Sequence, residues 1–94
     1  NHRIQRQDAD YIGHLVEVKK DHYVVLDIKK KDFHLAINDK IKMISPEGKI
    51  KEIVITTLRD INFNEVVSVS FGELAVLNHH RGLVPMSIAY KGES

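Results

Sequence analysis

The feature that most restricts the fold of this chain is a series of short apolar segments in which side chains alternate with a period of two. Such a period places alternate side chains on opposite faces of a strand, whereas a helix repeats every 3.6 residues. Turn residues interrupt the apolar runs about every eight to twelve residues, which is typical of small barrels and sandwiches. The segments that we expect to be strands are 11–18, 23–28, 40–45, 50–58, 66–70 and 83–90. Segment 71–77 fits either a strand or a turn of helix.

Two hairpins are predicted by local signals. The polar turn 19–22 joins the first two segments. Pro46 and Gly48 join the next two, because proline presets φ for a turn and glycine tolerates positive φ. Ile41 and Met43 alternate with charged residues and should face the same side.

The remaining apolar residues lead to three further expectations. Phe33, Leu35 and Ile37 are expected to close one end of a core. Ile61 and Phe63 are expected to be buried anchors of a polar link. Pro85 cannot donate a ladder hydrogen bond, so the segment 83–90 is expected to be an edge strand or to carry a bulge.

These segments predict an all-β domain, a small closed or partly open antiparallel β-barrel of about six or seven strands. Closure is favoured because no helix is predicted that would cover a sheet edge. The barrel is expected over residues 11–94, and residues 1–10 are expected to be a polar linker or arm from a larger parent protein. The first residues include neither an initiator Met nor an apolar run, so we expect a cytoplasmic protein without a membrane partner.

Two local clusters of basic residues are candidate binding sites. The 94 residues contain 14 Lys and Arg against 13 Asp and Glu, a net charge of +1, which argues against a surface that binds polyanions as a whole. The candidate substrate- or RNA-binding residues are Lys29, Lys30, Lys31, His79, His80 and Arg81. They would form one phosphate-attracting rim if the fold brought both loops to one end. The alternative interpretation is that each cluster is an ordinary solvated turn. The few aromatic residues occupy core-like positions, so RNA contact would depend on backbone and shape rather than on base stacking.

Residues with catalytic chemistry are present but not in a recognisable arrangement. The absence of cysteine excludes disulfides, thiolate metal sites, iron–sulfur ligation and a cysteine nucleophile. Six histidines are not spaced as ligand pairs on a strand face, and five glycines form no phosphate-binding loop. Ser68, Ser70, His79 and Asp60 supply the residue types of a triad, but no nucleophile-elbow pattern surrounds either serine. We therefore expect no catalytic residue, metal site or cofactor in this domain. The alternative is an independent hydrolase that uses His79 and His80.

Two stretches of sequence together are similar to a known family. They are the segment 11–18, which begins with Tyr11, Ile12 and Gly13, and the segment 38–48, which ends in a Pro-x-Gly turn. The combination resembles the C-terminal domain of the collagenase-like peptidase family of unknown catalytic type, family thirty-two, over about residues 11–90. Asn38 stands where this family has glycine, and asparagine also accepts left-handed φ. Lys42 stands where the family often has an acidic residue.

The resemblance implies that catalysis belongs to an upstream domain of the same parent chain. Some relatives are described as proteases, and others look like tRNA or rRNA hydroxylation proteins with cysteine-bound clusters and a prephenate-derived donor. Their C-terminal domain is similar to the β-barrels of translation factors. The expected function is a non-catalytic accessory domain that docks a protein or structured RNA substrate for a peptidase. The alternatives are the C-terminal domain of a tRNA uridine or rRNA hydroxylation protein, and a purely structural barrel that forms a homodimer.

Overall fold

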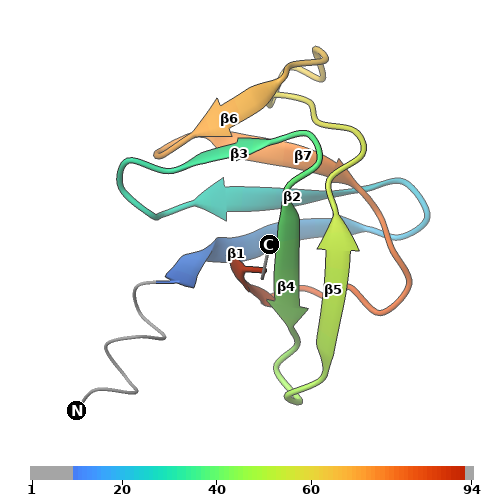
Figure 1. Cartoon of the computed structure of the whole chain (residues 1–94). Coiled ribbons are helices and arrows are strands. Elements are labelled where there is room, and N and C mark those ends of the chain that lie inside the picture. Colours follow the sequence, from blue (N-terminus) through green and yellow to red (C-terminus); the bar gives the residue numbers. More distant parts are fainter. Residues whose placement is uncertain (1–9, 93–94) are drawn as a thin grey trace.

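The computed structural model describes residues 10–92, which contain eight β-strands (Figure 1). They are β1 (Tyr11–Lys19), β2 (Tyr23–Ile28), β3 (His34–Ala36), β4 (Lys40–Ile44), β5 (Ile50–Val54), β6 (Ser68–Ser70), β7 (Leu74–Asn78) and β8 (Ile88–Lys91). The all-β prediction is confirmed, and the ambiguous segment 71–77 contributes a strand, β7. The proposed arm lies outside the described residues except for Asp10. No helix of the described part of the chain is long and apolar enough to cross a membrane.

The strands form one large and one small antiparallel sheet. The large sheet has the order β5-β4-β8-β1-β2-β7, and β3 pairs with β6 in the small sheet. In Figure 1, β4 and β5 cross the direction of β1, β2 and β7 at a steep angle, so the large sheet curls around the core. After β5 the chain reaches the other edge, where Arg59 and Val76 exchange backbone hydrogen bonds of 3.1 and 2.8 Å. The architecture is therefore a partly open antiparallel barrel.

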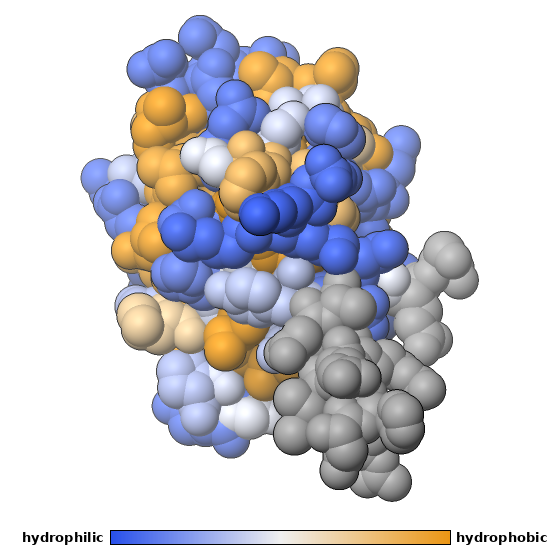
Figure 2. All heavy atoms as spheres, turned by 90° about the vertical axis from the view of Figure 1, so that its left-hand side faces the viewer, coloured by the Kyte–Doolittle hydropathy of each residue, from blue (hydrophilic) through white to orange (hydrophobic). Residues whose placement is uncertain are grey.

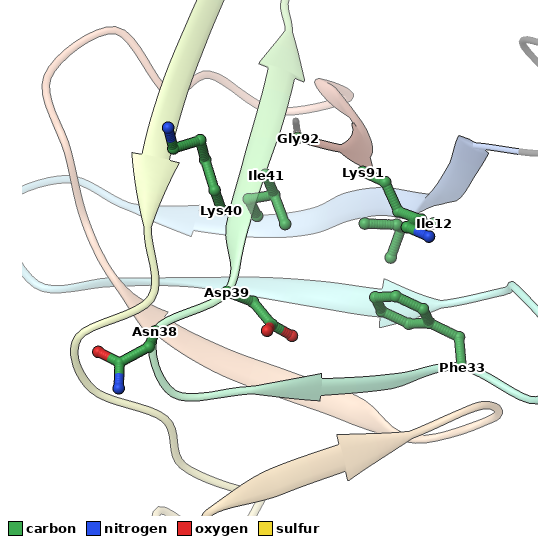
Figure 3. A pocket seen from close by; sticks show the side chains of 8 residues that line it. All are labelled: Ile12, Phe33, Asn38, Asp39, Lys40, Ile41, Lys91 and Gly92. Atoms are coloured by element: carbon green, nitrogen blue, oxygen red, sulfur yellow. The ribbon is translucent and has the colours of Figure 1, made fainter. Parts of the chain in front are cut away.

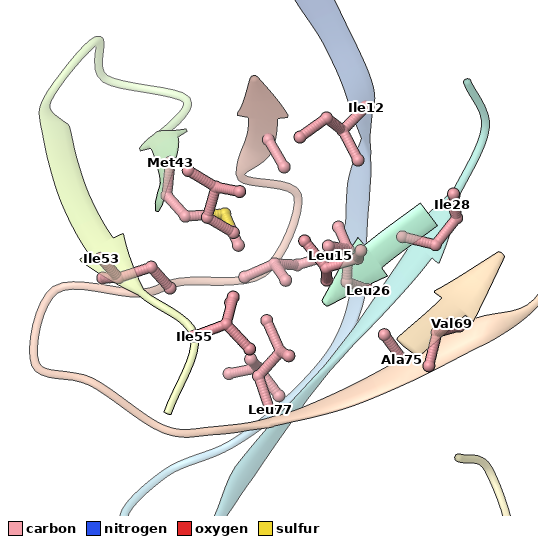
Figure 4. Close-up of a cluster of buried hydrophobic side chains, with 14 of the residues drawn as sticks. Ile12, Leu15, Leu26, Ile28, Met43, Ile53, Ile55, Val69, Ala75 and Leu77 are labelled. Carbon is pink, nitrogen blue, oxygen red and sulfur yellow. The ribbon is translucent and has the colours of Figure 1, made fainter. Parts of the chain in front are cut away.

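The core consists of apolar side chains without an aromatic centre (Figure 4). In β2 the alternate residues Val24, Leu26 and Ile28 belong to the core cluster and are all 0% exposed, and Val25 between them is also buried at 3%. Ile41 and Met43 of β4 face the core together, as expected. The other fully buried or nearly buried members are Ile12, Leu15, Leu35, Ile53, Ile55, Leu58, Val69, Ala75, Leu77, Leu83 and Ala89.

Local backbone geometry confirms the turn predictions. Gly48 of the β4–β5 hairpin has φ 90°, and Asn38 before β4 has φ 78°, both in the left-handed region. Leu35 is buried, and Phe33 and Ile37 are partly buried against the same cluster, so this segment does close one end of the core.

Other expectations were wrong. Residues 34–36, which lie in none of the expected strands, form strand β3 because it finds a partner in β6. Ile61 and Phe63 are 51% and 49% exposed instead of being buried anchors. Pro85 precedes β8, and β8 lies between β4 and β1 rather than at an edge, so proline interrupts no ladder there.

Candidate substrate-docking site

One groove of the barrel collects basic side chains beside an apolar wall. It lies between the β1–β2 turn and the loop that follows β7, and it encloses about 860 Å³. We call it the basic groove and define it by Lys20, Asp21, His79, Arg81 and Leu83. Gly82 and the neighbouring apolar residues Val18, Val84 and Pro85 complete its lining.

Strand pairing brings the two loops of the basic groove together. Tyr23 at the start of β2 pairs with Asn78 at the end of β7, so the segments beyond them meet. The backbone N–H of His79 donates to the His22 carbonyl at 3.4 Å, and the N–H of Asp21 donates to His79 Nδ1 at 3.2 Å. Leu83, 3% exposed, fixes the far side of the loop in the core. The groove is therefore a consequence of the β2–β7 register.

Positive charge surrounds the loop of the groove. Lys20 and Arg81 are exposed, and His80 lies beside Lys51 of β5. The pKa of His80 is lowered from 6.5, first by partial burial and then by the charges of Lys51 and His79. His80 is thus mostly neutral near pH 7. Lys20 and Arg81 supply the permanent positive charge of the lining, which Asp21 partly offsets.

The second basic cluster lies at the other end of the same ladder. Lys29, Lys30 and Lys31 follow the last residue of β2, and the six residues of β2 separate them from the groove by roughly 20 Å. The backbone N–H groups of Lys29 and Lys30 both donate to the Ile12 carbonyl, at 2.7 and 3.1 Å. The ammonium of Lys29 is 3.3 Å from the Asp27 carboxylate. The fold therefore does not unite the two clusters in one rim.

A smaller cavity of about 400 Å³ lies near this second end of the barrel. Figure 3 shows Phe33, Asp39 and Lys91 around it, from three different parts of the chain. The Asp39 carboxylate accepts the N–H of Ala36 at 2.9 Å, and this bond holds the β3–β4 turn.

The β2–β3 connection lies on the left of Figure 1, and on that face Figure 2 shows strongly hydrophilic residues between apolar ones. This end presents a mixed surface rather than a single charged field.

Ser70 and Asp60, which were considered as members of a triad, have other hydrogen-bond partners in the structure. Ser70 meets His34 rather than His79, with 2.8 Å between Ser70 Oγ and His34 Nδ1. The two are direct partners in the β3–β6 register, and Glu73 Oε1 accepts the N–H of Ser70 rather than a histidine proton. Asp60 accepts the N–H groups of Asn62 and Asn64 in its own loop, at 2.9 and 3.0 Å. This geometry is that of a cross-strand pair and an Asx-type turn.

The described part of the chain contains no cluster of side chains that could hold a metal ion. Within residues 10–92, no three His, Asp or Glu side chains come close enough to share an ion.

Aromatic side chains are the feature that the sequence reasoning placed wrongly. None of the six is in the buried class: Phe63 and Phe71 are 49% and 46% exposed, and the others are partly exposed. Tyr23 and Phe63 form an edge-to-face pair at 5.1 Å, and Tyr11 and Tyr90 form another at 6.0 Å. None of the buried members of the core cluster is aromatic, and Phe33 packs against them as a partly buried side chain. None of these rings lines the basic groove.

Comparisons with known proteins identify solved structures with a similar fold. The sequence matches no protein-family model and no curated protein. Among solved structures, it is similar to the C-terminal domain of a Geobacillus thermoleovorans protein described as a "putative U32 peptidase", with a TM-score of 0.77 and 16% identity over 89% of this chain and 93% of that one. The selenomethionine variant of the same domain gives a TM-score of 0.75 and 17% identity over 87% and 99%. The resemblance found in the sequence is confirmed at the level of the fold.

Proposed function

We propose that this chain belongs to the U32, or collagenase-like, peptidase family and is a C-terminal accessory domain that docks substrate for a catalytic domain of the same parent protein. The fold match covers nearly the whole of both domains. The segment around Gly13 and the turn around Asn38, which carry the sequence resemblance, both have special backbone positions in the structure. Ser70 pairs with His34 and Asp60 bonds within its own loop, so these side chains offer no triad that would favour catalysis by this domain.

The basic groove is the observation that supports docking, and its lining favours a polypeptide substrate. Lys20 and Arg81 attract carboxylates, while the more exposed apolar residues Val18, Val84 and Pro85 provide a surface for aliphatic side chains. A single-stranded RNA site normally adds aromatic platforms for base stacking, and no phenylalanine or tyrosine lines this groove. The substrate segment that we propose is therefore acidic and apolar polypeptide.

A direct binding measurement tests this assignment. The probe is a fluorescein-labelled peptide of alternating glutamate and leucine, followed by fluorescence anisotropy. Combined Lys20→Glu and Arg81→Glu should weaken binding at least tenfold, because charge reversal at two contacts removes attraction and adds repulsion. The matched control, Lys29→Glu with Lys31→Glu at the other end of β2, should leave the affinity within about twofold.

The competing RNA function has its own outcome in the same assay. With total tRNA as the probe, a docking function for RNA predicts tight binding that weakens and loses salt dependence when Lys29, Lys30 and Lys31 are changed to Ala. That result, together with no binding of the peptide, would indicate that the docked substrate is structured RNA rather than a polypeptide.

The accessory role is tested in the parent protein. Deletion of this domain should raise KM for the protein substrate while kcat is kept, because docking contributes to substrate binding rather than to the chemical step. An unchanged KM with reduced thermal stability alone would contradict docking and would indicate a structural module.

A further inference from the structure

The large sheet has one covered edge and one open edge. At β7 the backbone of Arg59 exchanges two hydrogen bonds with Val76, so the chain itself covers that edge. At the other edge lies β5, which pairs with β4 alone among the described strands (Figure 1). The five residues of β5 include no proline, and its register with β4 runs without a bulge. β5 therefore lacks two of the usual devices that prevent a further strand from pairing with a sheet edge.

The alternation of ladder hydrogen bonds determines which backbone groups of β5 point outward. Beside the β4–β5 hairpin, the N–H of Ser45 donates to the Lys49 carbonyl at 2.9 Å. Bonded and non-bonded pairs alternate in an antiparallel ladder, so Lys51 and Ile53 also bond to β4. The N–H and C=O groups of the alternate residues point away from β4, and they make no other backbone hydrogen bond within residues 10–92. These residues are Ile50, Glu52 and Val54.

The side chains along this open edge differ between the two faces of the sheet. On the outer face, Ile50 and Val54 are 64% and 43% exposed, and Glu52 lies between them without an ion pair among the described residues. Lys51 is on the inner face, because its partner in β4 is a core residue. A Cβ added at Gly82 would lie 3.8 Å from Lys51 Cδ, so the Lys51 side chain runs beside the basic groove.

We propose that the docked polypeptide leaves the basic groove as an extended segment and adds to the open edge of β5 as a further antiparallel strand. This proposal rests on the proposed function, since one segment occupies both places. Three residues of the segment, opposite Ile50, Glu52 and Val54, each exchange two backbone hydrogen bonds with β5, which gives about six bonds. Bonds of this kind supply affinity in strand addition, and the alternate side chains supply specificity.

The groups at the edge select an extended polypeptide as the occupant. Unpaired ladder groups are matched by another backbone with N–H and C=O groups at β spacing. Aliphatic side chains of the segment lie beside Ile50 and Val54, while an acidic side chain on the inner face lies beside Lys51. The alternation of acidic and apolar residues that suits the basic groove therefore also suits the edge. A second copy of β5 centred on the same strand would set Glu52 against its own copy, and like charges directly opposite are destabilising.

Backbone methylation of the peptide tests strand addition without changing the protein. The probe is the labelled peptide of alternating glutamate and leucine, prepared with N-methyl groups either on three successive leucines or on three successive glutamates. With leucines on the outer face, their N–H groups point to β5 and those of the glutamates point to solvent. Methylation of the leucines should weaken binding at least tenfold in fluorescence anisotropy, because it removes donors and adds bulk at the edge. Methylation of the glutamates should leave the affinity within about twofold.

Two variants at one position test the same edge from the side of the protein. Glu52→Pro removes an outward N–H without removing a bond to β4, and prolines are tolerated at such edge positions. It should weaken binding of the unmodified peptide at least tenfold. Glu52→Gln is the matched control, which keeps the N–H and should bind within about twofold of the wild type. Far-ultraviolet circular dichroism verifies that both variants are folded.

The outcomes distinguish this proposal from the proposed function. Equal binding of the two methylated peptides, or a larger loss with methylated glutamates, would overturn strand addition, while the groove would stand if Lys20→Glu with Arg81→Glu still weakened binding. A loss confined to methylated leucines, with no effect of those two charge reversals, would keep the edge and reject the groove. A wild-type chain that binds no peptide and forms a dimer that Glu52→Pro dissociates in sedimentation equilibrium would place a second copy at the edge and overturn the proposal.

Discussion

The close approach of β1 and β2 at Gly13 leads to the sharpest prediction for stability. Gly13 pairs with Ile28 and is buried, and a Cβ added there would overlap the carbonyl oxygen of Asp27 and lie 2.9 Å from its carbonyl carbon. Both atoms belong to the backbone, so no flexible side chain can move aside. Gly13→Ala must therefore push β2 away from β1.

The expected loss follows from what that displacement disturbs. The carbonyl carbon has to move by about 0.6 Å to reach an ordinary contact of about 3.5 Å, and the oxygen has to move further. The N–H groups of Lys29 and Lys30 both donate to Ile12 next to Gly13, and two such bonds contribute about 1 kcal/mol each. Strain from overpacking adds about 1–3 kcal/mol. The free energy of unfolding should fall by about 3–5 kcal/mol, a large part of the roughly 5–14 kcal/mol expected for a domain of this length.

Thermal unfolding followed by circular dichroism measures this loss. A change of about 3–5 kcal/mol should lower Tm by roughly 15–30 °C in a domain of this size. Gly72→Ala is the matched control: Gly72 has φ 87° with nothing within 4 Å of an added Cβ, so only the left-handed backbone costs about 1 kcal/mol. If Gly13→Ala lost no more stability than Gly72→Ala, the steric argument would be refuted.

Three further measurements test other parts of the structure. Asn38→Gly should keep the stability nearly unchanged while Asn38→Ala loses about 1 kcal/mol in thermal unfolding, because φ is 78° there; equal losses would contradict the left-handed assignment. Leu26→Ala should lose about 2–5 kcal/mol in urea unfolding, since Leu26 is 0% exposed, and a loss below about 1 kcal/mol would contradict its place in the core. The His80 pKa measured by NMR should lie below 6.5 and should rise in Lys51→Met. Since the folded state disfavours the protonated form, the stability that His80 contributes is complete above about pH 6.5 and is lost as pH falls below it, a dependence that His80→Gln should remove. A His80 pKa above 6.5 would show that burial does not dominate.

Features determined by neighbouring residues could be predicted from the sequence. The hairpin between β4 and β5 depends on Pro46 and Gly48 and on the alternation of Ile41 and Met43, all within a few residues, and each was correctly placed. The family resemblance also depended on local segments. One of its residues, Gly13, must be glycine because an added Cβ would overlap the backbone of Asp27.

Features determined by distant pairing could not be predicted in the same way. Strand β3 has only three residues, and it exists because β6 supplies a partner more than thirty positions later in the chain. The separation of the two basic clusters has the same origin: once β7 pairs antiparallel to β2, the loop at His79 must meet the β1–β2 turn and the lysines after Ile28 must lie at the far end. Local sequence shows the clusters but not the register that separates them.

The isoleucines show why sequence pattern alone also misses surface function. Ile41 and Ile53 lie in the core, whereas Ile44 and Ile50 lie one pleat away on the outer face of the same two strands. A pattern of hydrophobic residues counts all four as core candidates, because side-chain type does not record which face a neighbouring layer covers. Only the register of β4, β5 and β8 reveals that the outer isoleucines form one row without a covering layer among the described residues. Whether an isoleucine of these strands lies in the core or on the outer face is therefore decided by the register of the sheet and not by the local sequence.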